Sequence, residues 1–150
     1  MMWKTHLAFG FLVGLFLIQF FRPQNQILFM ALICLASVLP DIDHPNSKVG
    51  SKVKVIGFLF EHRGFFHGIA AIFLFSILSY MLFRQFIYAE AVFYGYLSHL
   101  ISDSITHEGI MPFHPLLKFR IKGLIKTGAA AEYLIFLILV IFDIYKVIHM

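Results

Sequence analysis

The chain has 150 residues, enough for one domain, and a formal net charge of +4. Hydrophobic residues make up 60% of it and charged residues only 13%, against roughly 25% in soluble domains. This composition excludes an ordinary soluble domain, because a chain of this size cannot bury so much apolar side chain. We therefore expect one membrane-embedded domain over residues 1–150. Its cations lie in loops between apolar stretches, so we expect no nucleic acid as partner.

Five apolar stretches follow one another along the chain, each near the ~20 residues that a helix needs to cross a bilayer. They are Thr5–Phe21, Gln26–Leu39, Gly64–Phe83, Phe86–Ile101 and Ala129–Ile148. Pro23 follows the first stretch and Pro40 ends the second, where proline cannot continue a helix. The pattern predicts an all-α bundle of about five transmembrane or membrane-embedded helices, with two long loops.

The long loops, 41–63 and 102–128, share one side with the amino terminus if every stretch crosses the membrane. Of the 12 Lys and Arg residues, only Arg22, Arg84 and Lys146 fall on the other side. The positive-inside rule then places the amino terminus and both loops in the cytoplasm. We therefore expect a multi-pass protein of the inner membrane.

Basic and apolar residues alternate in LLKFRIKGLIKTG, residues 116–128. A period of two predicts a short strand or hairpin along the membrane interface. Its lysines and arginine would contact anionic lipid or line a substrate groove.

Histidine and acidic residues gather on the predicted cytoplasmic side. They are His6, Asp41, Asp43, His44, Glu61, His62, His67, His99, Asp103, His107, Glu108, His114 and Glu132. Polar side chains at membrane depth are costly, so they normally face a cavity, pair with one another or hold an ion. Their common side predicts a functional site.

The clearest local pattern is YGYLSHLISDSITHEG. His99, Asp103 and His107 follow one another at intervals of four, so on one helix they would share a face. Imidazole nitrogen and carboxylate oxygen at this spacing can chelate a divalent ion. A simple hydrogen-bonded pair has the same spacing.

Two further patterns follow the ends of apolar stretches. In SVLPDIDHP, Asp41 and Asp43 are either turn formers or, together, a metal ligand and a group that orients a neighbouring imidazole. In EHRGFFHG, His67 is a further donor, and Arg63 is either a grip for phosphate or carboxylate or a positive-inside arginine. Glu132 stands where a carboxylate also complements a helix dipole.

Five motifs together, Thr5-His6, LPDIDHP, HRGFFHG, GYLSHLISDSITHEG and KTGAAAE, resemble the YdjM-like family of membrane-bound, predicted metal-dependent hydrolases. The resemblance covers nearly the whole chain and implies a metal-dependent hydrolase.

The order of ligand types is also similar, more loosely, to zinc-dependent phospholipase C. In that family a tryptophan amino group and a later HxxxE complete a three-metal cluster. Here Met1 precedes Trp3, and Gly128 stands four residues before Glu132 where that family has His. We therefore expect one or two ions.

Metal-assisted hydrolysis is the leading hypothesis, on a phosphoester or ester of a lipid-like or phosphorylated substrate at the cytoplasmic membrane face. A mixed nitrogen and oxygen set favours Zn²⁺, with Mn²⁺ as the alternative. The expected ligands are His6, Asp41, His67, His99 and Asp103. Groups that orient or replace them are Asp43, His44, His62 and His107. Glu132 or Asp43 would accept a proton, and Arg63 would hold an anionic group.

Two other functions stay open. A metal-ion or proton transporter would need polar residues through the full depth of the membrane, whereas the outer halves of the stretches are nearly all apolar. A non-catalytic metal-binding protein of a stress response would hold the same residues without turnover.

Overall fold

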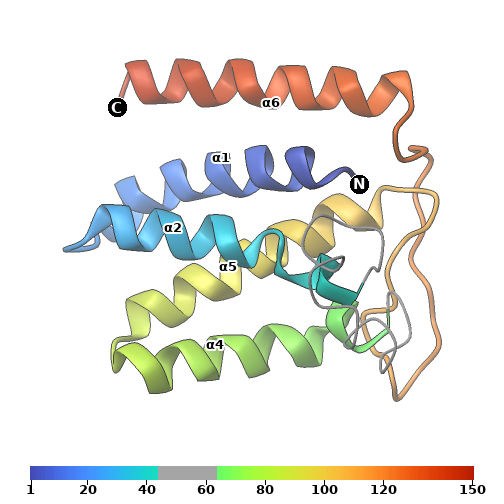
Figure 1. Cartoon of the computed structure of the whole chain (residues 1–150), viewed down its shortest axis with the longest axis horizontal. Coiled ribbons are helices and arrows are strands. Elements are labelled where there is room, and N and C mark those ends of the chain that lie inside the picture. Colours follow the sequence, from blue (N-terminus) through green and yellow to red (C-terminus); the bar gives the residue numbers. More distant parts are fainter. Residues whose placement is uncertain (44–63) are drawn as a thin grey trace.

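The computed structural model describes residues 1–43 and 64–150, and these form a bundle of α-helices (Figure 1). The helices are α1 (Trp3–Phe21), α2 (Gln26–Ala36), α4 (Ile69–Phe83), α5 (Phe86–Ser104) and α6 (Ala130–Ile148). Two 3₁₀ turns, η1 (Leu39–Asp43) and η3 (Phe65–His67), follow α2 and precede α4. The all-α class and the five helical stretches predicted from composition are confirmed.

Local chemistry explains where the helices end. Arg22 and Arg84 take left-handed backbone conformations after α1 and α4, and their N–H groups close the last turns. The Asn25 side chain caps α2 by accepting a hydrogen bond from the N–H of Leu28 at 2.9 Å. Short loops at these points make α1 and α2, and α4 and α5, run in opposite directions (Figure 1).

Helix α5 lies at the centre of the bundle and packs against α1, α2 and α4, whereas α6 packs chiefly against α1. Gly95 of α5 allows the closest approach, because a Cβ there would collide with the backbone of Ile33 on α2. The start of α1, the end of α5 and the start of α6 lie at the same end of the molecule as η1 and η3 (Figure 1).

Large apolar side chains cover the outward faces of α4 and α6. Examples are Phe73, Ile77 and Met81 on α4, and Leu137, Ile141 and Ile148 on α6. Within the described residues, α1 is the one helix that is both long and apolar enough to cross a bilayer, while α2 and α4 are apolar but shorter. The number of full membrane crossings therefore stays a prediction.

The strand or hairpin expected in residues 116–128 is wrong for the described structure. This segment makes two isolated bridges, Ile110 with Ile121 and Thr106 with Ile125, which are too short to form a strand. The remaining backbone is irregular, and Leu116 and Leu124 are 88% and 92% exposed. The segment lies against the chain that leaves α5.

Candidate metal centre

Five donor side chains from four elements converge at the end of the bundle where α1 begins. They are His6 on α1, Asp41 on η1, His67 on η3, and His99 and Asp103 on α5. They form two groups of three, with His99 in both, and the ligand atoms within each group lie within 4.8 Å of one another. All five side chains are buried, and Asp41 is the most exposed residue of the set at 8%.

Asp103 stands in the middle of the set. Its Oδ1 lies 3.4 Å from Nε2 of His6, and its Oδ2 lies 3.5 Å from Nε2 of His67. Nε2 of His99, one helical turn back, is 3.8 Å from the same Oδ2. The amino nitrogen of Met1 also contacts Oδ1. One carboxylate therefore faces three imidazole nitrogens.

The tautomer of His99 follows from its partner Ser37, the residue directly after α2. Its Nδ1 lies 2.8 Å from the carbonyl oxygen of Ser37, and a carbonyl oxygen only accepts. Nδ1 therefore carries the proton, and the lone pair of neutral His99 is on Nε2. That atom lies 3.3 Å from Nε2 of His67 and 3.8 Å from Oδ1 of Asp41.

The tautomer of His6 follows from Ser102 by the same reasoning. The Ser102 hydroxyl donates its only proton to the carbonyl of His99 at 2.8 Å. It can therefore only accept from Nδ1 of His6, which lies 2.7 Å away. The lone pair of His6 is then on Nε2, the atom that faces Asp103. Both imidazoles are thus set to present a lone pair to the centre, as metal-binding histidines require.

The donor set fits a divalent cation. The two buried carboxylates carry two negative charges, and the Met1 ammonium that pairs with Asp103 offsets one of them. A bound cation would compensate the remaining charge, which apolar surroundings do not stabilise. The Nε2 atoms of His67 and His99 lie 3.3 Å apart, and because the bond of His99 to Ser37 leaves its Nε2 without a proton, Nε2 of His99 accepts in this contact and His67 donates. Three imidazole nitrogens and two carboxylates are the donors that Zn²⁺ and Mn²⁺ accept.

Replacing Ser102 by Ala should lower the affinity for Zn²⁺ about 10- to 100-fold, because His6 loses the acceptor that orients its ring. Ser104→Ala is the matched control, since Ser104 makes the same kind of bond on the same helix, to Ile101 at 2.7 Å, away from the centre. The measurement is a competition titration of purified protein with a Zn²⁺ chelator. Equal affinities for the two variants would contradict this role of Ser102.

His107 does not share the helix face of His99 and Asp103, so that expectation is wrong. Helix α5 ends at Ser104, and the Thr106 hydroxyl bonds back to the carbonyl of Asp103 at 2.8 Å. His107 then pairs its N–H with the carbonyl of Ile125, and its side chain is exposed outside both groups of donors. The spacing of four residues therefore predicts a shared face for His99 and Asp103, which lie in α5, but not for His107, which lies beyond its end.

Glu132 lies beside the centre, not in either group of donors. Its fully buried carboxylate accepts one hydrogen bond from the N–H of Met2 at 2.5 Å and another from Gly128 at 2.6 Å. The bond from Met2 joins the start of α6 to the start of α1, and the bond from Gly128 closes the turn that leads into α6. The geometry favours an anchoring role over that of proton acceptor.

The other predicted positions cannot be placed. His44, His62 and Arg63 lie outside the described residues, and so does the side chain of Asp43.

Three groups that shape the centre were missed by sequence reasoning. They are the carbonyl of Ser37, the hydroxyl of Ser102, and Tyr96, whose buried hydroxyl donates to the carbonyl of Phe66 at 2.6 Å. This last bond ties η3, which carries His67, to α5. A serine beside Asp103 in an apolar helix was the available signal for Ser102.

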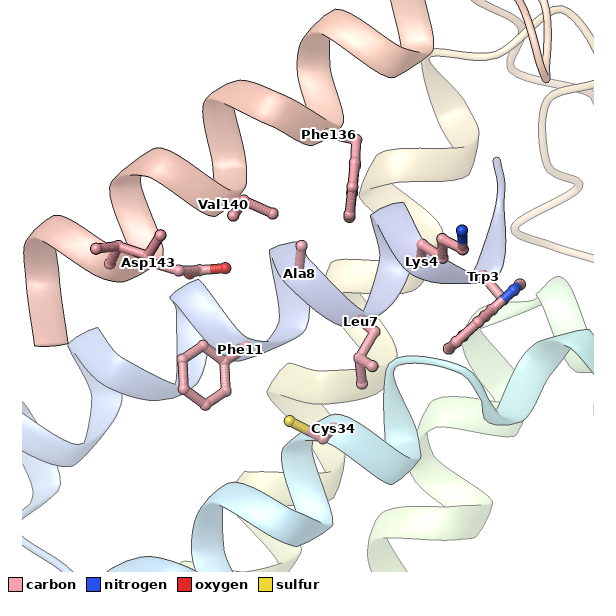
Figure 2. A pocket seen from close by; sticks show the side chains of 10 residues that line it. Trp3, Lys4, Leu7, Ala8, Phe11, Cys34, Phe136, Val140 and Asp143 are labelled. Carbon is pink, nitrogen blue, oxygen red and sulfur yellow. The ribbon is translucent and has the colours of Figure 1, made fainter.

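An apolar pocket of about 470 Å³ lies away from the donors, between α1, α2 and α6, with Cys34 and Asp143 among its lining residues (Figure 2). Its residues on α1 recur at intervals of three and four, such as Lys4, Leu7 and Phe11, and so form one helix face. His6 is not on that face. This pocket is therefore separate from the donor cluster.

Comparison with known proteins gives a family match over almost the whole chain. The family model described as YdjM inner membrane protein matches residues 1–149. The inner membrane proteins YdjM of Escherichia coli (strain K12) and Shigella flexneri are each 37% identical over 101 residues, 61% of this chain and 52% of theirs. The chain therefore spans about half the length of these relatives. The uncharacterized protein YvsG of Bacillus subtilis (strain 168) is 28% identical over 141 residues, 88% of this chain and 85% of that protein. No solved structure matches significantly.

Proposed function

For this chain, which belongs to the family of YdjM inner membrane proteins, we propose the function of a membrane-bound, metal-dependent hydrolase. The observation that carries this proposal is the convergence of five buried donors, two of them with their tautomers set by hydrogen bonds. The substrate would be a phosphoester or ester of a lipid-like molecule. Its reacting group would meet the centre at the cytoplasmic face of the membrane.

The proposed topology has five helices in the membrane, with the start of α1 and the centre on the cytoplasmic side. The cation distribution supports this orientation, since among the cations of residues 1–43 and 64–150 only Arg22, Arg84 and Lys146 lie at the opposite ends of the helices. The exposed apolar faces of α4 and α6 support contact with lipid.

We propose that one ion is held by His6, Asp41, His67, His99 and Asp103. His99 belongs to both groups of donors, yet its Nδ1 is bonded to Ser37, so only the Nε2 lone pair is available. One lone pair binds one ion, which favours a single Zn²⁺ or Mn²⁺ over a pair bridged by His99. When bound, such an ion lowers the pKa of a coordinated water towards about 7 and polarises the bond to be hydrolysed.

The surrounding residues hold the donor side chains in their orientations. Ser37 and Ser102 hold two imidazoles, and Glu132 holds the start of α1 against α6. Asp41, at the most exposed edge of the set, is the donor nearest to an arriving substrate. Asp43 and Arg63 stay proposed as proton acceptor and as the group that grips an anionic substrate.

Metal analysis of detergent-purified protein, followed by turnover assays, tests the proposal. We expect about one Zn²⁺ or Mn²⁺ per chain, as in a mononuclear site. We also expect the protein to hydrolyse a nitrophenyl ester or phosphodiester. A chelator should abolish this hydrolysis, and added metal should restore it. Protein without stoichiometric metal would contradict the proposal. Metal without turnover, together with uptake of the ion into liposomes, would instead support transport.

A further inference from the structure

One exposed surface of the molecule combines large apolar and basic side chains. It is formed by residues 113–126, in the chain between α5 and α6, and we call it the basic–apolar segment. Six of its large apolar side chains are between 41% and 92% exposed: Phe113, Leu116, Leu117, Phe119, Ile121 and Leu124. Exposing so much apolar surface to water is costly, and patches of this kind mark a contact with a membrane or another protein.

The charge of this segment favours an anionic lipid surface as the partner. Residues 113–126 contain no Asp or Glu. Their four cations are all exposed: Lys118, Arg120, Lys122 and Lys126. Leucine and phenylalanine beside lysine and arginine are typical of segments that lie in the interface of an anionic membrane. A nucleic acid or a soluble acidic protein would pair with the cations but would leave Leu116 and Leu124 in water.

The segment lies at the end of the bundle that carries the donor cluster. In Figure 1 the chain between α5 and α6 runs across the ends of the helices and not along them. Backbone hydrogen bonds hold it against the chain that leaves α5. Ile110 and Ile121 exchange two of them at 2.9 Å, and the N–H of Gly123 donates to the carbonyl of Thr106 at 2.8 Å. With helices that cross the bilayer as proposed above, the segment lies along the membrane surface.

The same stretch of chain supports the turn that carries His67. Ile69, two residues after His67, donates its N–H to the carbonyl of Pro112 at 2.8 Å. A Cβ added at Gly68 would lie 3.2 Å from the carbonyl oxygen of His114, so the backbone at the start of the segment lies directly against this turn. The turn, η3, has only three residues, and so short a helix depends on its neighbours for its position. Holding the segment in place therefore holds His67 in place.

We propose that the basic–apolar segment binds anionic phospholipid on the side of the membrane where the donor cluster lies, and that this contact strengthens metal binding by holding the turn of His67. Leu116, Phe119 and Leu124 insert next to the lipid headgroups, while the lysines and the arginine pair with their phosphates. This inference rests on the proposed function and makes its metal centre depend on lipid charge.

The position of Phe119 tests the lipid contact without any metal. In a Trp3→Phe background, which removes the single tryptophan of the chain, Phe119→Trp places one fluorophore in the segment. In nanodiscs that contain phosphatidylglycerol, we expect its emission to shift to shorter wavelength and to be quenched by brominated lipids. Emission as in water, without quenching, would overturn the proposal and would favour a soluble acidic partner for this surface.

Metal affinity tests the coupling to the centre. Competition with a chelator should show that Zn²⁺ binds at least about fivefold more tightly in nanodiscs with phosphatidylglycerol than in nanodiscs of phosphatidylcholine alone. The combined variant Lys118→Gln, Arg120→Gln and Lys122→Gln should abolish this difference. The matched control is the combined variant Arg22→Gln, Arg84→Gln and Lys146→Gln, which removes three cations from the opposite ends of the helices and should keep the difference.

Equal zinc affinity of the wild type in the two lipid mixtures would overturn the coupling, as would a lipid effect that both combined variants lose alike. Protein that binds no zinc in either mixture would overturn the proposed function and the coupling together. The fluorescence of the Phe119→Trp variant would then still decide whether the segment contacts lipid, because that measurement does not involve the metal.

Discussion

Replacing Asp103 by Asn should remove stoichiometric metal from the purified protein. Asp103 faces the Nε2 atoms of His6, His67 and His99 at 3.4 to 3.8 Å, so its carboxylate contacts all three imidazoles of the set. Loss of groups that only orient a ligand costs 10- to 100-fold in metal affinity, and loss of a direct ligand should exceed about 100-fold. Elemental analysis after dialysis against a weak chelator measures the effect.

Asp143→Asn is the matched control for this experiment. Asp143 is also a buried carboxylate in a helix, 8% exposed, but it lies on α6 and lines the pocket between α1, α2 and α6 (Figure 2). Its replacement should leave metal content at the wild-type level. If both variants lost metal alike, the loss would reflect general unfolding, and the central place of Asp103 would not be supported.

Replacing Gly95 by Ala should lower thermal stability and metal affinity together. Alanine favours a helix over glycine by about 1 kcal/mol, but its Cβ at this position would collide with the carbonyl oxygen and Cα of Ile33. A backbone cannot rotate out of the way, so α2 and α5 must separate, and overpacking of this kind costs about 1–3 kcal/mol. Separation also stretches the bond between His99 on α5 and Ser37 after α2.

Gly14→Ala separates this effect from the helix preference of alanine. At Gly14 a new Cβ would meet Sδ and Cε of Met30, the flexible end of a side chain that can move aside. We expect little change in the unfolding temperature for Gly14→Ala and a clear decrease for Gly95→Ala. Thermal unfolding in detergent, with and without Zn²⁺, compares the two. Equal decreases would show that close contact between α2 and α5 does not support the centre.

The sequence alone predicted the all-α class of the protein. It also predicted that the donor residues gather at one end of the bundle. Apolar stretches of near-bilayer length predicted five helices, and short turns such as that at Arg84 made successive helices run in opposite directions. Residues near alternate helix ends therefore return to one end of the molecule. This is why His6, Asp41 and His99, far apart in sequence, were expected on one side.

Tertiary structure decided which of these donors touch. The spacing of four residues predicted the pair of His99 and Asp103 but also His107, which lies beyond the end of the helix. The lone pairs of His6 and His99 depend on the Ser102 hydroxyl and on the backbone carbonyl of Ser37, which follows α2, and no local pattern encodes such partners. Periodicity describes one element at a time, whereas a binding centre depends on the distances at which several elements cross.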